Sequence, residues 1–345
     1  MKNLFCLLAL ISVTLPLQSV AAKIVNKPSS LTQMETDIEA GKFGKIVSVT
    51  IEQHGDIIYS RNFDKENGNA PHDIRSAGKS LTALAVGIAI DEGKLESVDQ
   101  KVWPLLGAPA DDIRNDITIR DLLTMSSALD CNDGKKRSPG QEERMYRKKI
   151  WRTFALNLPL MDGYQRDEKG YGRWSYCTAG VFLLGQVIET VTGEKFDAFV
   201  QTRLFDPLAI KEIVWRTSKT GEIQSGGQIK MLGPDLAKIG RMVLDGGVWK
   251  ESRIVSRTWI KQMLYPHREL SKFVHYGYLW WFTPIRAPQG FQSSWYMQGN
   301  GGNMVAVFRD YDAVIVVQAA NYNKSHASRN AFTIVEASLS SLQRP

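Results

Sequence analysis

The chain has 345 residues, of which 43% are hydrophobic and 10% aromatic, and its formal net charge is +7. This composition excludes a disordered or low-complexity protein, and the length allows a large core and two closely packed regions. Positive residues are dispersed except for two short runs, 135–137 and 147–149. We interpret both runs as solvated faces of loops or helices, and we expect no nucleic-acid partner.

The first residues have the order of a secretory signal peptide. A short basic start is followed by an apolar run at 4–17 and by small residues at 19–22, which predicts removal after Ala21 or Ala22. We therefore expect an exported protein, periplasmic or secreted. No other segment is long and apolar enough to cross a bilayer, so we expect no stable membrane insertion after the signal is removed.

Two cysteines remain after the predicted cleavage, Cys131 and Cys177. An even pair in an oxidising compartment is a candidate disulfide. Two buried free thiols are the alternative, because sequence alone cannot show that the two Cβ atoms meet.

The hydrophobic pattern predicts the following elements in chain order. A helix at 31–41 precedes two β-rich runs, 45–53 and 57–63, which His54-Gly55-Asp56 joins as a hairpin. A buried helix is expected at 74–93. The further expected helices are 118–125, 142–156, 178–190, 196–204, 234–246, 256–264 and 327–342, and the further expected strands are 276–282, 304–308 and 314–319.

Strands near both ends with helices between them predict an α+β fold. We expect an antiparallel sheet built from both termini and flanked by helices, with a mostly helical domain inserted. The predicted sheet-containing region comprises residues 23–70 and 247–345, and the mostly helical region comprises residues 71–246. We find no internal repeat.

The first turn of the helix at 74–93 carries Ser76 and Lys79. One helical turn puts both side chains on the same face, within hydrogen-bonding reach. A serine needs a neighbouring base to act as a nucleophile, and a lysine becomes such a base when burial lowers its pKa. The alternative is that Ser76 only caps the helix and Lys79 extends to solvent.

Two further stretches complete a pattern with Ser76-Ala77-Gly78-Lys79. They are Trp174-Ser175-Tyr176-Cys177-Thr178, before a buried helix, and Gln298-Gly299-Asn300-Gly301-Gly302-Asn303, before a strand. In order and spacing the three stretches resemble the β-lactamase and penicillin-binding-protein superfamily of serine hydrolases. The resemblance is strongest to the branch with class C β-lactamases, carboxylesterases and 6-aminohexanoate-dimer hydrolases, and it covers essentially the whole mature chain.

The resemblance implies a β-lactamase/transpeptidase-like fold and a role for each stretch. Ser76 would be the acylated nucleophile, Lys79 its general base and Tyr176 a second proton carrier. The backbone N–H groups of Ser76 and of a residue near Asn303 would form the oxyanion hole. No phosphate-binding loop, dinucleotide-binding loop or metal-ligand spacing is found, so neither a cofactor nor a metal is implied.

The remaining candidates are residues expected to contact substrate: Trp174, Thr178, Asn300, Gly301 and Gly302. Two of them depart from the family pattern, because Thr178 stands where asparagine is usual and Asn300 where lysine or histidine is usual. The missing charge at Asn300 favours esters or amides over β-lactams. A literal Lys-Thr-Gly at 219–221 lies in the middle of the chain, and we interpret it as an accidental match.

The sequence thus predicts an exported serine hydrolase that cleaves a small ester, amide or peptide-like substrate through an acyl-enzyme. A β-lactamase or D-alanyl-D-alanine carboxypeptidase is one alternative. A non-catalytic penicillin-recognising sensor module, acylated at Ser76 but never released, is another.

Overall fold

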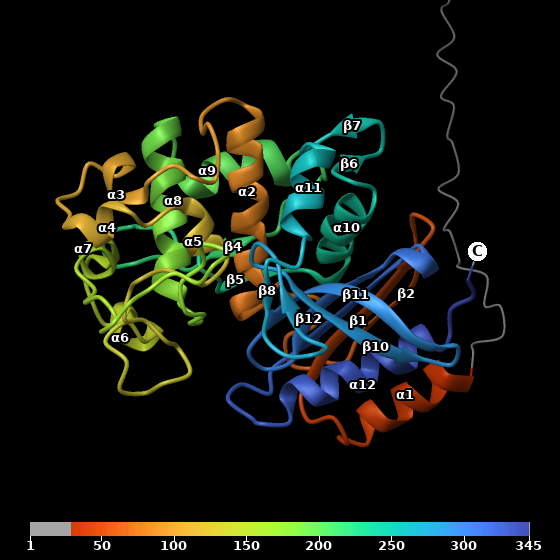
Figure 1. Cartoon of the computed structure of the whole chain (residues 1–345). Helices are drawn as coiled ribbons and strands as arrows, with labels where there is room; N and C mark the ends of the chain where they lie inside the picture. The colour runs from red at the N-terminus through yellow and green to blue at the C-terminus, as the bar shows by residue number, and fades with distance from the viewer. Residues whose placement is uncertain (1–28, 345) are drawn as a thin grey trace, which may run out of the picture.

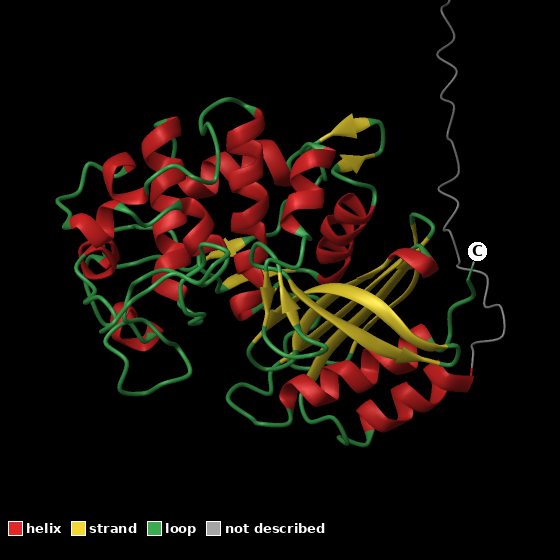
Figure 2. Cartoon of the chain, in the orientation of Figure 1, coloured by secondary structure: helices red, strands yellow, loops and turns green. Residues whose placement is uncertain are grey.

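The computed structural model describes residues 29–344, so the predicted signal peptide lies outside the described part. A twisted sheet with helices on both faces stands beside a mostly helical part (Figures 1 and 2). Within residues 29–344, none of the helices combines the length and the apolar character that crossing a membrane requires.

The main sheet has eight strands in the order β2-β1-β13-β12-β11-β10-β9-β8. β1 pairs antiparallel with β13, and Val49 lies opposite Val317, so the two ends of the chain meet in the sheet as predicted. The strand bounds are β1 Ile46–Gln53, β2 Asp56–Asn62, β8 Arg268–Glu269, β9 His275–Tyr276, β10 Trp281–Ala287, β11 Gly290–Gly299, β12 Asn303–Phe308 and β13 Ala313–Ala319.

Both faces of this sheet are covered, which explains why β13 is apolar throughout. Ile315 and Val317 point into the core formed with α1 (Ser29–Glu39) and α12 (Ala327–Leu339). The alternate residues Val314 and Val316 point into the second core, on the other face. Here α10 (Gly233–Leu244) packs directly on β1, β12 and β13, although the sequence assigned its residues to the helical region.

The helical part is built around α2 and α8, which pack on each other and are buried over most of their length. A capping box between Thr118 and Asp121 starts α5, in the segment where the sequence predicted a helix. The bounds are η1 Arg75–Gly78, α2 Lys79–Asp91, α3 Val102–Leu105, α4 Asp112–Asn115, α5 Ile119–Leu123, α6 Glu142–Tyr146, α7 Trp151–Leu156, α8 Thr178–Thr192, α9 Phe196–Val200, η2 Gln201–Phe205 and α11 Arg257–Met263.

Two smaller sheets complete the described elements. The first has the order β3-β5-β4, and the second pairs β6 with β7. Because β3 directly precedes η1, its pairing with β5 brings a distant loop to the start of α2. The bounds are β3 His72–Asp73, β4 Val214–Trp215, β5 Ile229–Met231, β6 Val248–Trp249 and β7 Ser252–Arg253.

Three of the differences between the structure and the predicted elements concern long elements. The helix expected at 142–156 is split into α6 and α7, because Glu222 accepts the backbone N–H groups of Trp151 and Arg152 and starts a new helix there. The strand expected at 276–282 is interrupted at Leu279, where φ is +58°. The long strand β11 was not predicted.

Candidate active site

Ser76 and Lys79 meet where η1 passes into α2. Lys79 is 1% exposed, and its Nζ donates to the Oγ of Ser76 at 3.0 Å and to the carbonyl oxygen of Gly226 at 2.7 Å. Burial lowers the pKa of Lys79, while the charges of Asp133 and Glu142 oppose that effect. The amine is therefore closer to the neutral form than an exposed lysine, as a general base must be.

Tyr176 reaches the same point from the loop before α8. Its hydroxyl lies close enough to the Ser76 side chain for that side chain to lower the pKa of Tyr176, and its ring centroid lies 5.0 Å from the Nζ of Lys79. The ring is stacked on Trp281 at 6.0 Å and packs against Trp174 at 6.1 Å. Burial raises the pKa of Tyr176, so the phenol holds its proton.

Asp133 ties the Tyr176 loop to the Lys79 side. Its backbone N–H donates to the carbonyl oxygen of Tyr176 at 2.9 Å. Its carboxylate accepts from the amide and the hydroxyl of Thr178 at 2.8 and 2.7 Å. Burial raises the pKa of Asp133 to about 6, against the lowering effect of Lys79. Thr178 is fully buried and holds Asp133 in place.

Cys131 and Cys177 form a disulfide bond with an S–S distance of 2.09 Å. Each partner stands close in sequence to a residue of the site, since Cys131 precedes Asp133 by two positions and Cys177 follows Tyr176. The bond therefore fixes two loops that are 46 residues apart in sequence, both of which contribute to the site.

The third stretch forms the end of β11 and the turn into β12. A Cβ on Gly299 would stand 2.0 Å from the carbonyl oxygen of Ile74, so only glycine allows β11 to pack on η1. Gly301 and Gly302 have φ values of +94° and +95° and form the turn. The side chain of Asn300 donates to the Oδ1 of Asn323 at 2.7 Å.

Asn303 and Trp174 lie away from the open surface of the site. Asn303 is 1% exposed, and its side chain donates to the carbonyl oxygens of Asn300 at 2.9 Å and Ala319 at 3.1 Å. It thereby fastens the β11–β12 turn to β13. Trp174 contributes to the aromatic cluster with Tyr276 and Trp281, which supports the ring of Tyr176.

The sequence missed the loop that precedes β5. Gly227 has φ +129°, and a Cβ there would lie 2.7 Å from the carbonyl oxygen of Arg75. The backbone N–H of Gln228 donates to that same oxygen at 3.0 Å. The adjacent glycines at 226 and 227 are the sequence feature from which this loop could have been predicted. The literal Lys-Thr-Gly lies elsewhere, since Thr220 donates to the carbonyl oxygen of Lys149 at 3.2 Å.

Ser76 opens into a cleft of about 260 Å³, called the catalytic cleft below. It carries three carboxylates and one cation, Arg75, which is paired with Asp73 at 3.2 Å. In residues 29–344 we find no group of three or more histidine, cysteine, aspartate or glutamate side chains that could hold a metal. The lining residues are Arg75, Ser76, Asp133, Gln141, Glu142, Glu143, Tyr146, Gly226, Gln228, Asn300, Tyr322 and Asn323.

Comparison with known proteins identifies the family. The sequence model of the family described as "Beta-lactamase" matches residues 45–338. The chain belongs to the β-lactamase family of serine hydrolases. Its α+β architecture, with an antiparallel sheet flanked by helices, is that of the β-lactamase/transpeptidase fold.

One sequence relative and two solved structures of similar fold are hydrolases. A 6-aminohexanoate-dimer hydrolase of Paenarthrobacter ureafaciens is 30% identical over 206 residues, which are 57% of this chain and about half (52%) of the relative. The structure of EstCE1, a hydrolase with promiscuous acyltransferase activity, has a TM-score of 0.70 at 17% identity, covering 89% of this chain and 98% of EstCE1. A D-stereospecific amidohydrolase from Streptomyces sp. has a TM-score of 0.65 at 18% identity, covering 89% and 97%.

Proposed function

We propose that this protein is an exported hydrolase that cleaves an ester or amide through an acyl-enzyme on Ser76. The observation that carries the proposal is the 3.0 Å contact between the Oγ of Ser76 and the buried Nζ of Lys79. A serine without a base at this distance would be a weak nucleophile, whereas a desolvated amine can accept its proton. Tyr176, whose pKa the neighbouring Ser76 side chain lowers, is the second proton carrier of this proposal.

Acylation begins with neutral Lys79, which accepts the Ser76 proton as Oγ attacks the carbonyl carbon. The lone pair of the neutral amine can accept this proton while one of its N–H groups still donates to the carbonyl oxygen of Gly226. The carbonyl oxygen gains negative charge in this step. Backbone N–H donors then stabilise it, each contributing about 3 kcal/mol.

We assign one oxyanion donor to the backbone of Ser76 and the second to the end of β11. The packing of Gly299 on η1 brings this end of the strand to the Ser76 turn. The sequence placed the second donor at a backbone N–H near Asn303, and this remains a prediction. Gly299 and Asn300 are further candidates, because Gly299 packs on the Ser76 turn and Asn300 lines the same cleft as Ser76.

Tyr176 acts as the proton donor to the leaving group. Its raised pKa keeps the phenol protonated, so it is suited to giving a proton to the departing alkoxide or amine. The ammonium of Lys79 then returns a proton to the phenolate directly, because the acylated Oγ of Ser76 has no proton to pass on. A water molecule then attacks the acyl-enzyme and gives a proton to neutral Lys79. The ammonium returns that proton to the Oγ of Ser76 as the acyl–Oγ bond breaks, which releases the carboxylic acid and restores the serine.

The charges of the catalytic cleft support a substrate without a carboxylate beside the scissile bond. Asp133, Glu142 and Glu143 would repel such a group, and Arg75 is already paired with Asp73. Asn300 has an uncharged amide at the position where the lysine or histidine usual in the family could bind a substrate carboxylate. We therefore favour a simple ester or amide over a β-lactam or a D-alanyl peptide.

The test is a panel of p-nitrophenyl esters, linear amide oligomers, nitrocefin and D-alanyl-D-alanine peptides, each with the wild type and Ser76→Ala. Turnover of an ester or amide that is lost in Ser76→Ala supports the proposal. Faster turnover of nitrocefin or the peptides would assign the protein to the rival enzymes. A stoichiometric adduct with fluorescent penicillin that is never released would indicate a sensor module. Export is tested separately, by the N-terminal sequence of the protein recovered from the periplasm or the medium.

A further inference from the structure

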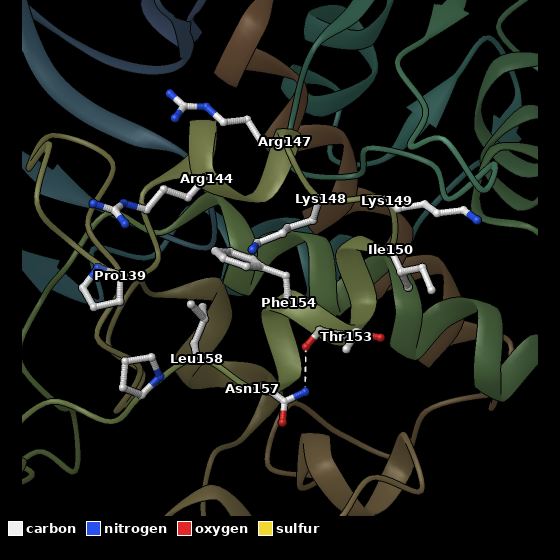
Figure 3. Close-up of a pocket in the computed structure, with 11 residues that line it drawn as sticks. Pro139, Arg144, Arg147, Lys148, Lys149, Ile150, Thr153, Phe154, Asn157 and Leu158 are labelled. Atoms are coloured by element: carbon white, nitrogen blue, oxygen red, sulfur yellow. Dashed lines mark hydrogen bonds between the residues drawn. The ribbon is translucent and has the colours of Figure 1, made fainter.

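A second cavity, larger than the catalytic cleft, lies along α6 and α7. Its volume is about 720 Å³, and we call it the basic groove (Figure 3). α6 contributes to both cavities, because Glu142 and Glu143 line the catalytic cleft whereas Arg144 lines the groove. The lining residues are Pro139, Arg144, Arg147, Lys148, Lys149, Ile150, Thr153, Phe154, Asn157, Leu158 and Pro159.

The charge of the groove is of one sign. Its four cations are Arg144, Arg147, Lys148 and Lys149, and no acidic residue lines it. All four are exposed, and within residues 29–344 none of their side chains forms an ion pair or a hydrogen bond. Figure 3 shows these side chains fanning out from the α6–α7 connection. Such a set of uncompensated charges attracts an anionic partner.

Apolar side chains lie between and below these cations. Phe154 is half-buried and Leu158 is buried at the floor, while Ile150 is 46% exposed directly after Lys149. The side-chain amide of Asn157 already donates to the carbonyl oxygen of Thr153 at 2.7 Å (Figure 3). The groove therefore combines exposed positive charge with apolar surface, and the Asn157 amide is already bonded within the chain.

We propose that the basic groove docks the protein on a bilayer that contains anionic phospholipid. Peripheral binding of this kind needs two signals, an apolar contact and electrostatic attraction to lipid headgroups. The run at 147–149 supplies the charge, and Ile150 with Phe154 supplies the apolar contact. The run at 135–137 adds further exposed cations in the loop that leads to Pro139.

A bilayer fits these observations better than the other anionic partners. A nucleic acid would engage the cations but leave the exposed Ile150 unused. An acidic peptide would engage the same cations, but it has no apolar layer to receive Ile150 and Phe154. Binding of a nucleic acid or of an acidic peptide is therefore included as an outcome of the test. The basic groove and the catalytic cleft share no lining residue, so docking and hydrolysis can be measured independently.

The experiment is flotation of the protein with vesicles of phosphatidylcholine alone and vesicles that also contain phosphatidylglycerol, at low and at high salt. We expect binding only to the anionic vesicles, weakened by salt. The variant Arg147→Ala/Lys148→Ala/Lys149→Ala should bind about 100-fold more weakly. Ile150→Ser, which changes no charge, should weaken binding severalfold.

The control Lys94→Ala/Lys195→Ala/Lys211→Ala removes the same charge from exposed positions outside the groove and should bind as the wild type does. Hydrolysis of a soluble ester and the circular dichroism spectrum confirm that each variant is folded. The proposal is overturned if anionic vesicles are not bound or if the control loses as much affinity as the groove variant. It is also overturned if Ile150→Ser has no effect while single-stranded DNA or an acidic peptide binds at the same site.

Discussion

The carboxylate of Asp133 accepts hydrogen bonds from both the backbone amide and the hydroxyl of Thr178, at 2.8 and 2.7 Å. This bond pair fixes the start of α8 directly after Tyr176. The same carboxylate acts electrostatically on Lys79, whose pKa it raises against the larger lowering effect of burial. In the proposed mechanism, Asp133 is thus a positioning residue for both proton carriers.

The first prediction concerns Asp133→Asn. Lys79 must be neutral to accept the Ser76 proton, so kcat/KM rises as the pH rises through the pKa of Lys79. Removing the negative charge lowers that pKa further, so the acid limb should move to lower pH. We expect kcat to fall about 10- to 100-fold, because the Tyr176 loop is held less accurately.

The matched control for this prediction is Glu143→Gln, which also removes a carboxylate from the catalytic cleft. Glu143 is not among the charges that act on Lys79, so the acid limb should stay in place. An acid limb that is unmoved in Asp133→Asn, or that moves to higher pH, would contradict the assigned coupling.

The second prediction separates the roles of Tyr176 and Lys79. In Tyr176→Phe the leaving group loses its proton donor, so a poor leaving group should suffer most. We expect kcat/KM for an alkyl ester or amide to fall about 10²- to 10⁴-fold, and that for a p-nitrophenyl ester much less. Lys79→Arg should lose activity on both, because a guanidinium remains charged. Equal losses for both leaving groups in Tyr176→Phe would count against the donor role.

The third prediction concerns the disulfide between Cys131 and Cys177. The bond closes a long loop, and chain-entropy arguments attribute about 4 kcal/mol of stability to a loop of this length. Cys131→Ser/Cys177→Ser should therefore unfold at lower urea concentration and should lose kcat, since the loops of Asp133 and Tyr176 are released. Alkylation of the unreduced wild type should label neither cysteine. Labelling of both would show that the bond is absent.

The fourth prediction concerns the contact between β11 and η1. Gly299→Ala would place a Cβ 2.0 Å from the backbone oxygen of Ile74, so the strand must move away from the Ser76 turn. We expect a loss of kcat of about 100-fold, because donors to the oxyanion shift. Gly134→Ala, where a Cβ meets only the Asn132 side chain at 3.4 Å, should retain activity. Full activity of Gly299→Ala would exclude this strand end from the oxyanion site.

Much of the fold could be predicted because the signals were local. The hairpin of β1 and β2, the buried helix α2 and the sheet formed by both termini follow from hydrophobic patterns that the structure confirms. The break between α6 and α7 could not be predicted, because the capping carboxylate of Glu222 lies about 70 residues away in sequence. β11 was missed because its residues mix serine, glutamine and aromatics without a clear alternation.

In the candidate site, too, local contacts could be predicted and long-range contacts could not. Ser76 and Lys79 share one helical turn, so their contact follows from spacing. The role of Asp133 depends on long-range packing. The only sequence feature that indicated its position near Tyr176 was Cys131, two residues before it, as a candidate disulfide partner of Cys177. Gly226 reaches Lys79 through the pairing of β3 with β5, which no local pattern predicted.

The most direct test of the account is mass spectrometry of the protein after reaction with a fluorophosphonate probe. We predict one adduct per chain, located by peptide mapping on Ser76, formed by the wild type and absent from Ser76→Ala. Lys79→Ala should form it far more slowly while keeping its fold. An adduct that persists in Ser76→Ala, or that maps to another residue, would contradict the assignment of Ser76 as the nucleophile.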